Sequence, residues 1–326
     1  MSGPRNMMAL ACASLIAAAL AGCAGLPVPG FVPAGEAGPV WPAPPDPPRV
    51  RWVGQYAAAG GGYVRPHGLN AAPDGSICVA DPGGRVVWLH RPDGKSTALG
   101  RDRLSSPVSC ALLPDGRVAV ADSAAAAVVF LDRKGKIDWT SLPGEFERPA
   151  GLVVDERTGT VWVADARSHR VVALTLDGSR RDVLGGRGSE PGRFNFPTAV
   201  AVGPAGGLHV LDSLNFRVQV LEPDGTPRLV FGIAGDGPGT FYRPRGLGVD
   251  EQGRVYVADA LFDNVQLFDR EGRLLLAVGS RGRGPGEFWM PAGVSVAPGG
   301  RILVADAYNQ RVQVFRLIAD AGAGGS

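Results

Sequence analysis

The stretch VADAYNQRVQVF, from Val304 to Phe315, decides the fold, because closely similar stretches stand earlier in the chain. VLDSLNFRVQV runs from Val210 to Val220, and VADARSHRVVAL runs from Val163 to Leu174. Internal repetition of this kind is the sequence signature of repeat architectures. The repeated line therefore has to be placed in a larger unit before any single residue is interpreted.

A proline opens each copy of the larger unit, and six copies align from it. Successive prolines are 41 to 48 residues apart, a length that accommodates four short strands together with their turns. The six prolines are Pro66, Pro107, Pro149, Pro197, Pro244 and Pro291.

Each unit contains short, alternating, β-branched runs that are separated by turn residues. In the fifth unit these runs are GLGVD, RVYVAD and NVQLFD, and a fourth run, RLLLAVG, closes the unit. Turn signals such as EQG and REG separate the runs, and a glycine-rich link leads to the next proline. Four antiparallel strands that repeat about every 45 residues describe one blade of a β-propeller.

The whole pattern resembles the NHL repeat. Its parts are R-P-x-G-L-x-V-D, V-Y-V-A-D, N-x-R-V-Q-V-F and G-x-x-G-x-G-P-G-x-F, which keep this order from about Val50 to Arg316. The second unit departs from it, since ADSAAAAVVFLD lacks the Asn and the Arg and its link is shortened to LPGEFERP. The resemblance implies an all-β fold, a six-bladed β-propeller over residues 49–316, followed by a flexible tail at 317–326.

The last blade lacks a fourth strand of its own, because LIADAGAGGS at the end of the chain cannot supply one. VRWVGQY, from Val50 to Tyr56, precedes the first unit and matches the fourth-strand run LLLAVGS of the fifth unit. We therefore expect the N-terminal strand to complete the last blade, which would pair an open sheet edge and close the ring.

The first 48 residues predict a processing signal and a spacer. The apolar run from Met7 to Gly22 is shorter than the roughly 20 residues of a membrane span, and it ends in Leu-Ala-Gly-Cys, which resembles a bacterial lipobox. We expect residues 1–22 to be a lipoprotein signal peptide, Cys23 to carry the lipid, and residues 23–48, with their nine prolines, to be a linker. The membrane is then a partner through Cys23, and the location is the cell envelope, at the outer membrane facing the periplasm in a Gram-negative cell. A cleaved signal with a chance cysteine is the alternative.

The charge argues against nucleic acid as a partner, and the cysteines leave a possible disulfide open. The formal net charge of +2 gives no global field for nucleic acid, and we expect none to bind. Cys78 and Cys110 fall on neighbouring units and could pair; we expect buried thiols instead.

An aspartate follows the second strand of every unit, where it is placed to accept backbone N–H groups of a turn. We expect a structural role for Asp81, Asp122, Asp165, Asp212, Asp259 and Asp306.

Histidines give no metal site. The NHL family includes a zinc-dependent amidating lyase, and resemblance to it would require several channel-facing histidines. Only His67 among the four histidines directly follows a blade-opening proline. Its counterparts make no ligand set; they are Val108, Ala150, Thr198, Arg245 and Ala292. We expect no catalytic residue, metal or cofactor, and the alternative is a metal-dependent propeller lyase or hydrolase that resembles this lyase or the lactonases.

Strand alternation places the glycine-rich links on one face, together with the turns between second and third strands. Exposed, variable loops make this face the default binding surface, and arginines outnumber acids there. We predict that it binds a protein, peptide or glycan of the envelope that presents an anionic surface. The predicted contacts are His67, Arg193, Arg243, Arg245, Arg281, Arg283, Phe216, Phe262 and Tyr308. Three further arginines begin third strands and are alternatively explained by ion pairs with acids of neighbouring blades: Arg170, Arg217 and Arg311.

Overall fold

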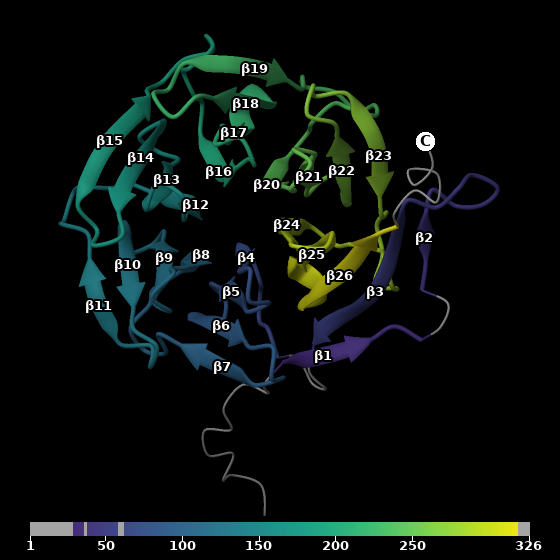
Figure 1. Ribbon diagram of the computed structural model, residues 1–326, viewed down its shortest axis with the longest axis horizontal. Helices are drawn as coiled ribbons and strands as arrows, with labels where there is room; N and C mark the ends of the chain where they lie inside the picture. Colours follow the sequence, from purple (N-terminus) through teal and green to yellow (C-terminus); the bar gives the residue numbers. More distant parts are fainter. Residues whose placement is uncertain (1–28, 36–37, 58–61, 319–326) are drawn as a thin grey trace, which may run out of the picture.

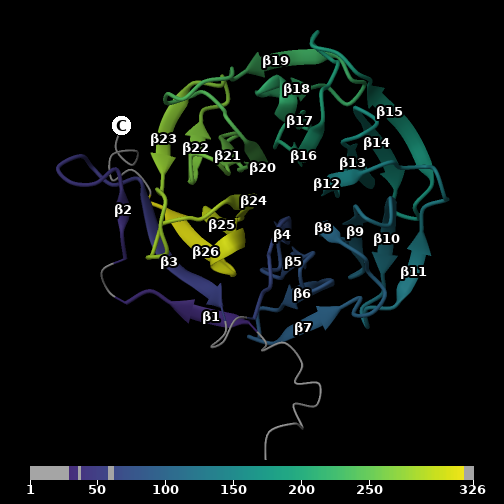
Figure 2. The ribbon, with the colours of Figure 1, turned by 180° about the vertical axis from the view of Figure 1, so that it is seen from behind.

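The protein is a six-bladed β-propeller (Figure 1, Figure 2). The computed structural model describes residues 29–35, 38–57 and 62–318. Five four-stranded antiparallel sheets and one larger sheet surround a central axis, which confirms the predicted fold class. The predicted signal peptide, Cys23 and most of the predicted tail lie outside the described residues. Within the described ranges, no helix has the length and hydrophobicity to cross a membrane.

Each of the first five blades has four strands, which follow the chain from the axis outward (Figure 1). Blade 1 comprises β4 (Leu69–Ala71), β5 (Ile77–Asp81), β6 (Val86–His90) and β7 (Ser96–Leu99). Blade 2 comprises β8 (Pro107–Leu112), β9 (Val118–Asp122), β10 (Ala127–Leu131) and β11 (Ile137–Thr140). Blade 3 comprises β12 (Pro149–Asp155), β13 (Thr160–Asp165), β14 (Arg170–Thr175) and β15 (Arg180–Gly185). Blade 4 comprises β16 (Pro197–Val202), β17 (Leu208–Asp212), β18 (Arg217–Leu221) and β19 (Pro227–Phe231). Blade 5 comprises β20 (Pro244–Val249), β21 (Val255–Asp259), β22 (Asn264–Phe268) and β23 (Leu274–Val278).

Blade 6 closes the ring with a strand from the other end of the chain. Its inner strands are β24 (Pro291–Ala297), β25 (Arg301–Asp306) and β26 (Arg311–Leu317). The fourth strand is β3 (Val50–Ala57), which pairs antiparallel with β26 so that Gly54 lies opposite Val314 and Trp52 opposite Phe315. The predicted closure by the N-terminal strand is confirmed.

The segment before β3 is more than a linker. β1 (Gly30–Pro33) and β2 (Val40–Trp41) both pair with β3 and extend blade 6 outward. The Trp41 ring meets the ring of Phe315 edge-on, with 5.7 Å between centroids. The prediction that residues 23–48 form only a linker is therefore wrong for the described part. The prolines do not prevent pairing because β1 and β2 lie at a sheet edge, where a missing N–H costs no ladder hydrogen bond.

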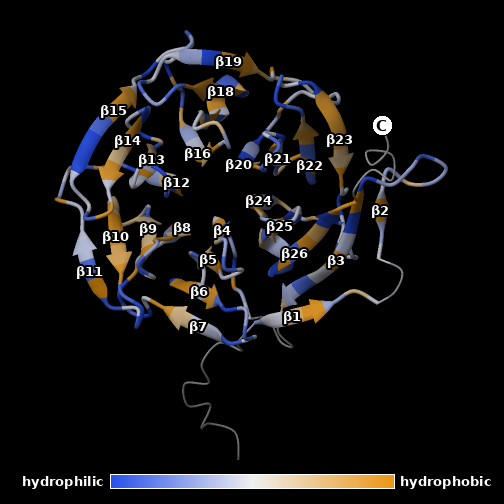
Figure 3. Ribbon diagram, viewed as in Figure 1, coloured by the Kyte–Doolittle hydropathy of each residue, from blue (hydrophilic) through white to orange (hydrophobic). Residues whose placement is uncertain are grey.

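The core is divided into six apolar clusters, one between each pair of neighbouring blades. Side chains of the third strands, such as β10 and β14, are largely apolar, whereas the outer strand β15 begins with a polar run (Figure 3). Cys78 and Cys110 lie in the cluster between blades 1 and 2, and both are buried and free. This confirms the expectation of buried thiols.

The aspartates after the second strands fasten each blade to the link before it. Backbone N–H groups of Val64 and Arg65 both donate to Asp81 at 2.8 Å, and the other five carboxylates accept equivalent bonds. All six are at most 1% exposed. The predicted structural role is confirmed.

Arginines that begin third strands complete this arrangement. The Nε of Arg217 lies 2.8 Å from Asp212, and Arg170 and Arg311 pair in the same way with Asp165 and Asp306. Their partners are aspartates of their own blade, so the alternative of ion pairing holds for these three arginines, but the neighbouring blade does not supply the acid.

Truncation from the N-terminus is expected to destabilise the protein in two steps. A chain that begins at Arg49 loses β1, β2 and the contact between Trp41 and Phe315, which we expect to cost about 1 to 3 kcal/mol. A chain that begins after Ala57 also loses β3 and uncovers the core of blade 6, at a cost comparable to the whole stability of a domain, about 5 kcal/mol or more. Urea unfolding followed by circular dichroism measures both, and equal midpoints for the two truncated chains would contradict the role of β3.

The charge of the blade aspartates should matter only where an arginine is buried beside them. Asp212→Asn leaves the side chain of Arg217, which is 12% exposed, without its counter-charge, and we expect a loss of about 3 kcal/mol or more. Asp122→Asn is the matched control, because blade 2 has no such arginine, and we expect a loss of about 1 kcal/mol. Chemical denaturation compares them, and losses of equal size would show that the ion pair contributes nothing.

Candidate functional site

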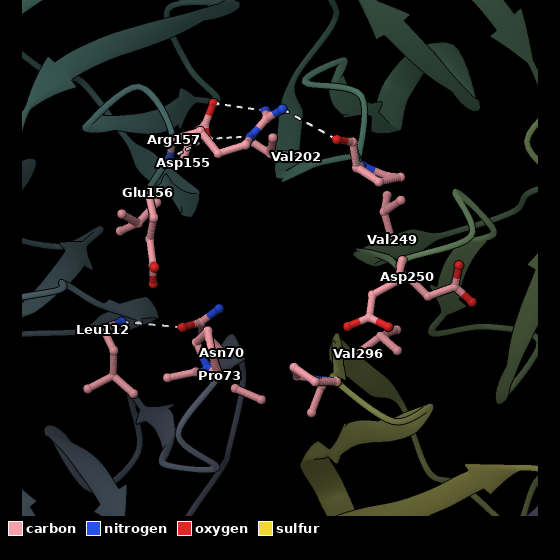
Figure 4. Close-up of a pocket in the computed structure, with 18 residues that line it drawn as sticks. Asn70, Pro73, Leu112, Asp155, Glu156, Arg157, Val202, Val249, Asp250 and Val296 are labelled. Carbon is pink, nitrogen blue, oxygen red and sulfur yellow. Dashed lines mark hydrogen bonds and ion pairs between the residues drawn. The ribbon is translucent and has the colours of Figure 1, made fainter.

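The central channel opens at both ends, and the two openings differ in shape and in charge. The first, which we call the turn mouth, is bounded by the turns between first and second strands and holds a cavity of about 310 Å³ (Figure 4). The second, the link mouth, is bounded by the residues that follow the blade-opening prolines and holds a recess of about 50 Å³. Both are candidate sites. The comparison between them rests on whether their polar side chains are already paired within the protein.

At the turn mouth, the buried carboxylates already hold their own turns. Asp155 accepts from the guanidinium of Arg157 at 3.2 Å, as the dashed lines in Figure 4 show. Asp250 accepts from the Arg254 guanidinium at 2.6 Å and from the Tyr256 hydroxyl at 2.9 Å. In the described part of the chain, no three His, Cys, Asp or Glu side chains are grouped so that they could hold a metal ion.

At the link mouth, the structure brings His67 and Arg245 together on the wall of one recess. The Nδ1 of His67 is hydrogen-bonded to the carbonyl of Val108 at 2.9 Å. Burial, helped by the charge of Arg245, lowers the pKa of His67 to about 4, so its ring is neutral at pH 7. Burial and the nearby Arg243 lower the pKa of Arg245, although a guanidinium keeps its charge at any physiological pH. Arg245 makes no ion pair or side-chain hydrogen bond within the described residues.

Three more arginines surround this mouth. Arg65, Arg148 and Arg243 precede the prolines of blades 1, 3 and 5, and all three are exposed. The charges of Arg65 and Arg148 add to the lowering of the pKa of His67. Sequence reasoning singled out Arg243 and missed the other two, although the recurring Arg-Pro pair carried the signal.

An aromatic surface lies beside the link mouth on blades 5 and 6. In each link a buried phenylalanine, Phe241 or Phe288, fixes the chain in the blade interface. The next residue then points outward, and these residues are Tyr242, which is 58% exposed, and Trp289. The ring of Tyr242 lies 6.3 Å from that of Phe262.

Blade 6 adds stacked side chains to this surface. The rings of Trp289 and Tyr308 have centroids 5.5 Å apart, and the guanidinium of Arg283 lies 5.1 Å from the Trp289 ring. Arg281 lines a shallow hollow of about 210 Å³ with Arg283 and Trp289. We call the set Tyr242, Phe262, Arg281, Arg283, Trp289 and Tyr308 the aromatic patch.

Two of the predicted contact residues lie on other blades. Arg193, in the link between blades 3 and 4, donates to the carbonyl of Gly185 at 2.9 Å. Phe216 packs against the apolar cluster between blades 4 and 5. A binding role for these two stays a prediction. The sequence analysis missed Trp289 and Tyr242, whose common signal is their place directly after the link phenylalanine.

Comparison with known proteins identifies the repeat. The family model of the NHL repeat matches residues 146–174 and 288–315, in blades 3 and 6. No curated protein matches the sequence.

Solved structures share the architecture at low identity. A gluconolactonase from Xanthomonas campestris is 19% identical, with a TM-score of 0.63 over 88% of this chain and 100% of that chain. Virginiamycin B lyase from Staphylococcus aureus is 16% identical, with a TM-score of 0.57 over 78% of this chain and 96% of that chain. A chain of the nidogen/laminin complex is 16% identical, with a TM-score of 0.57 over 74% of this chain and 86% of that chain. At these identities the likeness concerns the fold alone. The protein is therefore a six-bladed β-propeller with NHL repeats, which the family model matches in blades 3 and 6.

Proposed function

We propose that this protein is a non-catalytic binding module of the bacterial cell envelope, held to the membrane by a lipid on Cys23. Its partner is a protein, peptide or glycan with an anionic surface. The observation that carries the proposal is the aromatic patch next to the arginines of the link mouth. Trp, Tyr and Arg are the residues that most often dominate the binding energy of interfaces.

The electrostatics of the link mouth favour an anionic partner. Arg245 is half-buried, so its charge has lost part of its hydration, and no acid among the described residues compensates it. A carboxylate of a partner would restore that compensation through two parallel hydrogen bonds, for which the guanidinium is preorganised. The aromatic patch would supply the apolar contact around this central ion pair.

The proposed anchor would hold the rim of blade 6 close to the membrane. Six residues, 24 to 29, separate Cys23 from the start of β1 at Gly30. Six residues span at most about 20 Å, far less than the spacer that the sequence suggested. Because β1 is the outer strand of blade 6 and lies at neither mouth of the channel, this attachment would leave the link face accessible to a partner in the envelope.

A second candidate function is that of a lyase or hydrolase that works at the turn mouth. The wider opening of the channel at this end favours it, as does the shared fold with a gluconolactonase and a lyase. Zinc or calcium in stoichiometric amount in the purified protein, or turnover of a lactone, would favour this function over the binding module.

Removing charge at the link mouth and in the aromatic patch should weaken partner capture without unfolding the protein. For Arg245→Ala combined with Arg283→Ala we expect at least about tenfold weaker binding and a smaller dependence on salt. The partner is first identified by crosslinking and mass spectrometry in the envelope, and its affinity is then measured at two salt concentrations.

The control for this experiment is Lys134→Ala with Arg180→Ala, two exposed cations at or directly after turns between third and fourth strands, on the face away from the links. The control should leave both affinity and melting temperature unchanged. If the test variant binds as well as the wild type, the arginines take no part in binding. If its melting temperature falls, the arginines are structural. Either result contradicts the proposal.

The anchor has a test of its own. Cys23→Ser removes the thiol that would take the lipid, so we expect an unacylated precursor that leaves the membrane fraction. Membrane fractionation and the intact mass of the protein measure this. An unchanged mass and unchanged fractionation of the variant would show that Cys23 carries no lipid, while the binding proposal for the link face would still stand.

A further inference from the structure

A cavity of about 710 Å³ lies at the seam between blade 6 and blade 1. It shares no lining residue with either mouth of the channel. One wall comes from β1, β3, β25 and β26 of blade 6, and the other comes from the first turn of blade 1 and from the β6–β7 hairpin. Figure 1 and Figure 2 show this place at the rim, where the start of β1 lies next to β7. The volume is that of a site for a small molecule.

Positive charge dominates the seam cavity. Arg91, Arg301 and Arg316 line it, and Arg301 and Arg316 form no ion pair with any described residue. The one carboxylate of the lining, Asp74, accepts hydrogen bonds from the backbone N–H and the hydroxyl of Ser76 at 2.8 and 3.0 Å. Its oxygens are thereby engaged in holding its own turn, and it forms no ion pair with Arg91, Arg301 or Arg316.

One arginine of the cavity has a side-chain N–H group without a hydrogen-bond partner. The Nε of Arg301 is buried and has no hydrogen-bond partner among the described residues. Arg301 lies beside Tyr56: burial raises the pKa of Tyr56, and the charge of Arg301 and a side-chain hydrogen bond with it oppose that rise. The side chain of Arg301 nevertheless lines the cavity, so its positive charge acts on a ligand that binds there.

The same blade 6 wall is also aromatic, and its rings reach across the seam to blade 1. Phe31 of β1 is 47% exposed, and its ring lies 5.2 Å from that of Tyr56. The ring of Tyr56 in turn lies 4.8 Å from that of His90, at an interplanar angle of 38°. Both ring nitrogens of His90 are hydrogen-bonded, to Tyr63 at 2.6 Å and to Ser96 at 2.7 Å. Burial lowers the pKa of His90 to about 4, so the ring is neutral at pH 7 and the arginines alone supply the charge.

We propose that the seam cavity is a binding site for an anionic amphiphile, a molecule with one carboxylate or sulfonate on an aromatic or aliphatic body. The anionic group lies between Arg301 and Arg316, and the body packs against Phe31 and Tyr56. Such a ligand touches β1 and β3 on one side and blade 1 on the other, so it bridges the seam where the ring closes. The site depends neither on the lipid anchor nor on the link face.

The probe for a first test is 1-anilinonaphthalene-8-sulfonate, an anionic aromatic whose fluorescence rises in an apolar site. In the full chain, Arg301→Gln with Arg316→Gln should raise the Kd of the probe at least about tenfold, because charge-assisted hydrogen bonds are lost. Phe31→Ala should also weaken binding, since it removes the wall and keeps the charge. The control, Arg167→Gln with Arg180→Gln, should leave the Kd unchanged.

Competition between two amphiphiles of equal chain length tests the sign of the charge. Dodecanoate, below its micelle concentration, should displace the probe and raise the melting temperature, whereas dodecyltrimethylammonium should do neither. Equal displacement by both would mean that the site recognises only the apolar body. An unchanged Kd in the Arg301 and Arg316 variant, or an equal change in the control, would show that the probe binds elsewhere. Each of these results would overturn the proposal.

Discussion

The pairing of β3 with β26 is the constraint on which the rest of the structure depends. It joins residues that are more than 250 positions apart, such as Gly54 and Val314, and so converts a row of blades into a ring. Only in a closed ring do the six positions after the blade-opening prolines face one another, which is why His67 of blade 1 and Arg245 of blade 5 can share a recess. The same pairing creates the seam between blades 6 and 1. The seam cavity is lined in part by β1, which pairs with β3 and has no counterpart in the other described blades.

The residues of the candidate surfaces stand next to buried residues in the sequence. Each blade buries the aspartate after its second strand, and each full-length link buries a phenylalanine. These buried side chains fix the direction in which the neighbouring side chains point, but they do not restrict which residue type stands there. Position by position, the residue before the blade-opening proline alternates around the ring, with arginine in blades 1, 3 and 5 and Ser106, Phe196 and Met290 in the others. The scaffold sets where a side chain points, and the variation between blades sets what the surface can bind.

Periodicity in the sequence predicted the blades, their closure and the role of the aspartates, because each of these follows from local pattern and from the count of strands. It also placed His67 and Arg245 at one mouth. It did not predict β1 and β2, since nine prolines indicate an extended spacer unless the open edge of β3 is considered as a partner. The sequence analysis named Arg283 and Tyr308 but not Trp289, which lies between them. Trp289 and Tyr308 belong to different loops, and their contact depends on how a link folds back over its blade. The seam cavity has no sequence signal, because its walls come from the two ends of the chain and from a turn of blade 1.

The arginines of a nearly neutral chain can still form cationic sites, because opposite charges are used unevenly. The net charge is only +2, yet many carboxylates act as acceptors within the fold: the six blade aspartates hold links, Asp155 and Asp250 hold turns at the turn mouth, and Asp74 holds a turn at the seam. A carboxylate whose lone pairs are occupied by neighbouring N–H groups is a poor additional partner for a mobile guanidinium. Arg245 at the link mouth and Arg301 and Arg316 at the seam therefore form no ion pair among the described residues, and it is this internal use of acids, rather than an excess of base, that gives the two surfaces the positive charge on which both proposals rest.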